Sequence, residues 1–203
     1  MMTLVAPCAI GAEKVLSNEL RQCGFLPISN TKGRVLFSGG ANRADNKPLS
    51  PNSSTKPHIL ETVSGEDLKI IYQSNLMLRT ADRIFLQMAQ IPCRDFSDLF
   101  DGVCSVPWEH WFKRDVRVVV DKVRTRASAL ASEHSVQGVV HKAIYERLGK
   151  AWGMDLLPET GAAIAVRVYI ENNIAQILLD LSGMPLHRRG YRTAGGEAPI
   201  RET

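Results

Sequence analysis

The side chains with the clearest chemical potential are cations and hydroxyls grouped between residues 122 and 128. Lys122, Arg124 and Arg126 alternate with other residues, and Thr125 and Ser128 add two hydroxyl groups. Lysine and arginine neutralise phosphates, and hydroxyls bond to phosphate and sugar oxygens, so this segment suits a nucleic-acid backbone. The alternative interpretation is a solvated loop, because charge runs usually face water.

Positive charge is concentrated around this segment. Between His110 and Lys150 there are nine Lys or Arg residues and four Asp or Glu residues, a balance of +5 against +4 for the whole chain. Lys142, on the polar face of a predicted helix, belongs to this region. A second cluster near the end of the sequence contains Arg188, Arg189 and Arg192. Charge alone does not choose between nucleic acid, a membrane surface and an acidic protein.

Other chemistries have weak support in the sequence. His134 and His141 share a helical face without a third metal ligand type nearby, so we expect no metal site. The cysteines are too widely spaced for a metal knuckle or a disulfide framework. No run of about 18 apolar residues occurs, and the first residues lack the basic flank of a signal peptide. We therefore expect a cytoplasmic protein that does not contact membranes.

The first 94 residues predict an α+β domain with the order βαββαβ. Strands are expected at 3–8, 25–29, 34–37 and 84–91, with helices at 12–23 and from residue 65. This second helix is expected to carry Leu68, Ile71, Tyr72, Leu76 and Arg79. Residues 39–64 are rich in Pro, Ser, Asn and Gly and are predicted to form a flexible insertion. The order indicates a ferredoxin-like split βαβ sandwich.

Residues 95–183 predict a second domain with the order ααβαββ. Short helices are expected at 95–102 and 107–112, and a strand at 116–121. Lys122–Ser128 would then be a loop before a long helix, whose apolar positions recur at helical spacing from Val136 to Trp152. Two strands, 163–170 and 174–181, flank a turn at Glu171-Asn-Asn173.

Three segments carry a resemblance to a known family. They are Leu181-Ser-Gly-Met-Pro-Leu-His-Arg-Arg-Gly-Tyr-Arg192 with Glu197–Thr203, Ser74–Arg83, and Ser135–Ile144. These resemble the N-terminal region of the bacterial 23S ribosomal RNA guanine-N2 methyltransferases, in which a ferredoxin-like domain precedes an RNA-binding THUMP domain. The resemblance implies a linker at residues 184–203 that leads towards a C-terminal methyltransferase domain. It also implies S-adenosylmethionine (SAM) as the cofactor of the parent enzyme.

The resemblance supplies no catalytic residue within these 203 positions. There is no strand followed by a Gly-rich turn for the cofactor, and the family's Asn-Pro-Pro-Tyr or Asp-Pro-Pro-Tyr segment is absent. We therefore expect a non-catalytic chain without a cofactor of its own, whose partner is structured RNA, expected to be 23S ribosomal RNA. Two alternatives remain open: the RNA-binding half of a transfer-RNA methyltransferase, and a non-enzymatic RNA or protein interaction module.

Overall fold

The computed structural model describes residues 2–39 and 58–188, which pack into two compact units. Unit 1 consists of the described residues within Met1–Pro51, Val63–Leu86 and Leu181–Thr203. Unit 2 consists of those within Asn52–Thr62 and Gln87–Asp180. Each unit therefore combines segments that are distant in sequence. One strand, β5, contributes its beginning to unit 1 and the rest to unit 2.

Unit 1 is the predicted ferredoxin-like sandwich. Its elements are β1 (Leu4–Pro7), α1 (Glu13–Gln22), β2 (Leu26–Thr31), β3 (Arg34–Ser38), α2 (Gly65–Met77) and the start of β5 (Phe85–Pro92). The strands lie in the order β2-β3-β1-β5, and all their pairings are antiparallel. Gly33 has a φ of 78° in the β2–β3 turn, the left-handed conformation that glycine adopts without strain. The predicted hairpin is thereby confirmed.

The helices of unit 1 differ in how they use their apolar side chains. Leu16 and Leu20 of α1 are fully buried, and α1 contacts β2 and β3. In contrast, Leu68, Tyr72 and Leu76 of α2 are exposed. Helix α2 buries Asp67 and Ser74 instead. The Asp67 carboxylate accepts a hydrogen bond from the Ser64 backbone in a capping box, which fixes the start of the helix from inside.

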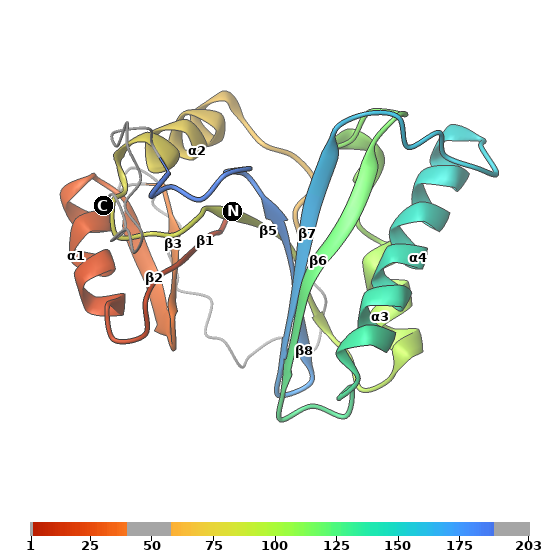
Figure 1. Ribbon diagram of the computed structural model, residues 1–203, viewed down its shortest axis with the longest axis horizontal. Helices are drawn as coiled ribbons and strands as arrows, with labels where there is room; N and C mark the ends of the chain where they lie inside the picture. The colour runs from red at the N-terminus through yellow and green to blue at the C-terminus, as the bar shows by residue number, and fades with distance from the viewer. Residues whose placement is uncertain (1, 40–57, 189–203) are drawn as a thin grey trace, which may run out of the picture. The chain divides into compact units, whose positions relative to one another are not determined.

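Unit 2 has the predicted ααβαββ order, preceded by strands. After β4 (His58–Ile59) and most of β5 come α3 (Phe96–Cys104), the 3-10 turn η1 (Trp108–His110), β6 (Arg117–Arg126), α4 (Glu133–Trp152), β7 (Ala163–Glu171) and β8 (Ile174–Asp180). The strand order is β5-β8-β7-β6, with β4 beside β5. Strands β6 and β7 are parallel, whereas β7 and β8 form an antiparallel hairpin. Helices α3 and α4 cover one face of β6, β7 and β8 (Figure 1).

The core of unit 2 lies between this helix layer and the sheet. The long predicted helix, α4, buries the apolar side chains that define its period, namely Val136, Val140, Ala143, Ile144 and Leu148. Helix α3 begins at the expected N-cap, Asp95, which accepts a hydrogen bond from the Asp98 backbone at 2.8 Å. Helix α3 approaches β5 so closely that a Cβ on Gly102 would lie 2.3 Å from an Ile91 side-chain carbon. The layers are thus tightly packed.

The predicted flexible insertion at 39–64 includes structured residues at its end. Residues 40–57 lie outside the described part of the chain. His58–Ile59 form β4, which pairs with β5, and Leu60 is buried. The sequence showed no apolar period there, because a strand of two residues is too short to produce one.

The segment after β8 returns to unit 1. The Leu181 and Leu186 backbone amides donate to the carbonyls of Ile84 and Asp82 at 3.0 and 2.8 Å. Arg83 donates to the Gly183 carbonyl at 2.6 Å, which is a structural role for this arginine. Arg188 is exposed at the end of this segment, whereas Arg189 and Arg192 lie outside the described residues.

Candidate nucleic-acid interface

The predicted basic loop is part of a strand. Lys122, Arg124, Thr125 and Arg126 belong to β6, which continues to Arg126 rather than ending at Asp121. The pairing of β6 with β7 shifts register between Val120 and Lys122, so Asp121 and Lys122 are both exposed. A bulge of this kind interrupts the alternation by which strands are recognised. The sequence pattern therefore ended the strand too early.

Two of the three cationic side chains in the C-terminal half of this strand are paired with carboxylates. Arg124 donates to both oxygens of Glu133, at 2.9 and 3.2 Å. A guanidinium nitrogen of Arg126 lies 3.6 Å from a carboxylate oxygen of Glu171, and 74% of the arginine side chain is exposed. Among the described residues, no ion pair is formed by Lys122. The three cations therefore differ in how readily they can bind a further anion.

The hydroxyl groups stabilise the connection from β6 to α4. Thr125 donates to the Ala131 carbonyl at 3.2 Å, and the Ser128 hydroxyl accepts from the Leu130 amide at the same distance. Ala127 has a φ of 45°, which requires local support in a residue with a Cβ. Both hydroxyls thus shape this connection, and each oxygen retains further capacity to accept a hydrogen bond.

Lys122, Arg124 and the first turn of α4 line one cleft of about 500 Å³. The lining residues from α4 are Glu133, His134 and Gln137, and β6 also contributes Asp121 and Val123. Ser132 caps the helix through a hydrogen bond from the Ser135 amide, and the helix start has a partial positive charge. The two cations and the helix N-terminus of this cleft favour anions, whereas the Asp121 and Glu133 carboxylates in the same lining oppose them.

Helix α4 also protects the free edge of β6, the last strand of the sheet. Gln137 donates to the Val120 carbonyl at 2.6 Å, and the Val118 amide donates to the Tyr145 hydroxyl at 3.3 Å. Burial raises the pKa of Tyr145, whose ring stacks on His141 with centroids 4.3 Å apart. These contacts occupy backbone groups that would otherwise allow another strand to pair with β6.

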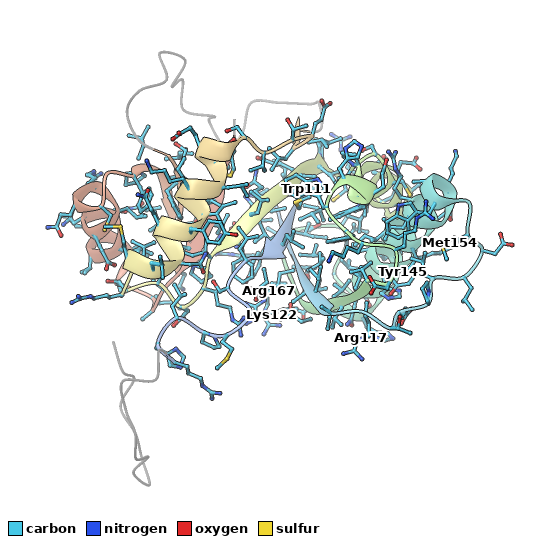
Figure 2. All side chains as sticks on the ribbon, turned by 90° about the horizontal axis from the view of Figure 1, so that it is seen from above. Trp111, Arg117, Lys122, Tyr145, Met154 and Arg167 are labelled. Atoms are coloured by element: carbon cyan, nitrogen blue, oxygen red, sulfur yellow. The ribbon has the colours of Figure 1, made fainter. Side chains whose placement is uncertain are left out.

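A further arginine, Arg167 of β7, was missed by sequence reasoning. It pairs in register with Lys122, and the two residues lie near each other in Figure 2. Arg167 donates to both carboxylate oxygens of Asp121, at 2.9 to 3.1 Å. Only 15% of its side chain is exposed. Asp121 and Arg167 are 46 positions apart, and no local sequence signal pairs them. This ion pair holds Asp121, which removes one carboxylate from competition for Lys122.

Lys142 lies away from the β6 cluster, the group formed by Lys122, Arg124, Thr125, Arg126 and Ser128. Its ammonium group lies over the Phe100 ring, 5.8 Å from the centroid. It lines a separate cleft of about 540 Å³ with Tyr145 and Met154, towards the other end of α4 (Figure 2). Nine residues separate Lys142 from Glu133, roughly 14 Å along the helix. The sequence prediction thus grouped residues that the fold places at different sites.

The other candidate chemistries find little support in the described residues. No group of three His, Cys, Asp or Glu side chains among them is placed to hold a metal ion. All four cysteines are free, and burial is the largest cause that raises each thiol pKa, to about 11 for Cys8 and Cys93. Within the same part of the chain, no helix is long and apolar enough to cross a membrane.

Comparison with known proteins identifies the domains. The RlmL ferredoxin-like domain model matches residues 3–44, and the THUMP domain model matches residues 93–180. The chain contains both domains. The THUMP match covers α3, η1, β6, α4, β7 and β8, so the β6 cluster belongs to the THUMP domain.

Relatives of this chain are RNA methyltransferases. YpsC of Bacillus subtilis (strain 168), described as a candidate RNA methyltransferase, is 34% identical over 99% of this chain and 45% of YpsC. The ribosomal RNA large subunit methyltransferase K/L of Psychromonas ingrahamii is 28% identical over 100% of this chain and 24% of that protein. The solved structure of SMU.472, a candidate methyltransferase complexed with SAH, has a TM-score of 0.77 and 32% identity, over 98% of this chain and 46% of SMU.472. The chain thus spans less than half the length of these relatives, and in the large-subunit methyltransferases it matches the N-terminal part.

Proposed function

We propose that this chain is the RNA-recognition part of a SAM-dependent ribosomal RNA guanine-N2 methyltransferase. The observation that carries the proposal is the match of both domains, in order, to the N-terminal part of large-subunit ribosomal RNA methyltransferases. We further propose a division into a ferredoxin-like domain at 1–94, a THUMP domain at 95–183 and a linker at 184–203. The partner would be structured 23S ribosomal RNA, bound in the cytoplasm.

The RNA would lie along the C-terminal half of β6 and the start of α4. Lys122, Arg124 and Arg126 would contact phosphates, while Thr125 and Ser128 would offer oxygens to 2′-hydroxyls. Such contacts read the shape and charge of an RNA helix rather than its base sequence. A methyltransferase must also take its target base out of the stack, which needs a firm hold on the flanking RNA. The β6 cluster would provide these contacts to the flanking RNA.

The turn between β6 and α4 does not fit SAM. The parallel connection β6-α4-β7 is the type of crossover at which cofactors bind in α/β folds, but its turn, Ala127-Ser-Ala-Leu-Ala-Ser132, contains no glycine. The backbone there is occupied by Thr125 and Ser128. We therefore assign SAM binding and methyl transfer to a separate domain of the parent enzyme.

Salt-dependent RNA binding tests the proposal. The affinity of the chain for an RNA hairpin is measured by fluorescence anisotropy at several salt concentrations, with a DNA duplex of the same stem sequence as comparison. Changing Lys122, Arg124 and Arg126 together to Ala should weaken RNA binding and reduce the slope of log affinity against log salt by about two to three.

A control triple variant removes the same residue types from the start of β6 and the turn before it. Lys113, Arg114 and Arg117 are exposed, and Arg117 lies roughly 16 Å along the strand from Lys122, about twice the Debye length at physiological salt. This variant should retain most of the affinity. The proposed site would be refuted if the unaltered chain did not bind RNA, or if both triple variants were folded and lost RNA affinity equally.

A further inference from the structure

The Arg124–Glu133 ion pair lies in the cleft that we assign to RNA. Glu133 is the first residue of α4, and its two oxygens accept from the same Arg124 nitrogen at 2.9 and 3.2 Å. Both side chains are about half exposed, 58% for Arg124 and 46% for Glu133. The pair is therefore not part of the core, and water or a ligand can reach it.

The carboxylates on this surface offset most of its positive charge, three against four cations when Arg167 is counted. The strand cations are Lys122, Arg124 and Arg126, whereas Asp121, Glu133 and Glu171 lie beside them. Asp121 is held by Arg167, and Glu171 is a looser partner of Arg126 at 3.6 Å. Glu133 is different, because it binds Arg124 closely and lines the cleft with Lys122.

We propose that the Glu133 carboxylate occupies the position of an RNA phosphate and competes with RNA for Arg124. The inference rests on the proposed function and deepens it. A phosphate in the cleft would meet Arg124, Lys122 and the first turn of α4, which are the groups that now surround the carboxylate. One phosphate must displace Glu133, whereas a correctly shaped RNA adds contacts from its other phosphates. Glu133 thus lowers the affinity of every anion that uses Arg124, and a ligand with several phosphates retains further contacts that allow it to bind.

The test replaces the carboxylate by its neutral isostere, Glu133→Gln. An exposed ion pair contributes less than about 1 kcal/mol of free energy. Because RNA no longer has to break this pair in the variant, we expect roughly two- to fivefold tighter binding to the RNA hairpin. The salt slope should steepen by up to about one unit, because Arg124 then contributes its full charge. Glu146→Gln is the matched control: Glu146 is exposed on the same helix, thirteen residues further along, roughly 20 Å away. Its effect should be negligible at physiological salt, where the Debye length is about 8 Å.

The effect must also depend on Arg124. In an Arg124→Ala background, Glu133→Gln should leave RNA affinity within a factor of about two, because there is no Arg124 guanidinium for which Glu133 and RNA compete. Equal gains from Glu133→Gln in both backgrounds, or equal gains from Glu146→Gln, would show a general charge effect and refute the competition. Circular dichroism verifies that each variant is folded. If the unaltered chain binds RNA and Glu133→Gln does not bind more tightly, the inference fails while the proposed function stands. Absence of RNA binding by every variant would refute both.

Discussion

Arg147 connects α4 to α3 and η1, and its removal should destabilise unit 2. Its Nε donates to Glu109 at 3.0 Å, a second guanidinium nitrogen donates to the other carboxylate oxygen, and the third donates to the Cys104 carbonyl at 3.3 Å. The side chains of Arg147 and Glu109 are 32% and 19% exposed. Because the carboxylate would remain half-buried without a partner, Arg147→Met should lower the free energy of unfolding by about 2–3 kcal/mol.

Thermal and urea denaturation followed by circular dichroism measure this loss. For a chain of this size, each kcal/mol lowers the Tm by about 2–4 °C, so a decrease of about 5–10 °C is expected. Arg114→Met is the control, since Arg114 is exposed and lies near the same helices in sequence. A double-mutant cycle with Glu109→Gln should show coupling of about 1 kcal/mol or more between the two positions.

The pH dependence gives an independent readout of the same ion pair. The hydrogen bonds from Arg147 hold the pKa of the Glu109 carboxyl below its ordinary value. A lowered pKa in the folded state stabilises the protein above the unfolded-state value, about 4.3 for glutamate, and this stabilisation is lost as the pH falls. The stability difference between the unaltered chain and Arg147→Met should therefore be full at neutral pH and decrease below pH 4.3 or so. If Arg147→Met is no less stable than Arg114→Met at neutral pH, the assigned role is incorrect.

Three further results are expected. Gly102→Ala should destabilise unit 2 by about 1–3 kcal/mol in urea denaturation, because its methyl group would lie 2.3 Å from an Ile91 carbon, and an unchanged midpoint would show that the α3–β5 contact adapts. Cys8 and Cys93 should react with a thiol reagent at pH 8 far more slowly than glutathione, since burial raises each pKa to about 11; rapid labelling of the folded chain would contradict their burial. The chain should not bind SAM in isothermal calorimetry, and a dissociation constant below millimolar would overturn the assignment of the cofactor to another domain.

Short-range features of this chain were predictable from the sequence. The hairpin at Gly33 and the turn at Asn172 depend on residues that accept positive φ, and both are present. The periodicity of α4 identified its buried face, because a long helix repeats the same pattern over many turns. The sequence also predicted α2, but it did not indicate which face of that helix is buried. The side chains of Ser74 and Asp67 can be buried there because local hydrogen bonds satisfy their polar atoms, and apolar periodicity does not reveal such bonds.

The sequence by itself determined the types of side chain at the candidate site and the order of the elements around it. It placed cations and hydroxyls at 122–128 and a helix immediately after them. Only the tertiary structure decided which of these cations have partners. Glu133 reaches Arg124 because α4 folds back along β6, and Asp121 meets Arg167 because two parallel strands 46 positions apart pair with a bulge. Such contacts depend on strand register and helix packing, which are set by many distant residues together rather than by the local pattern.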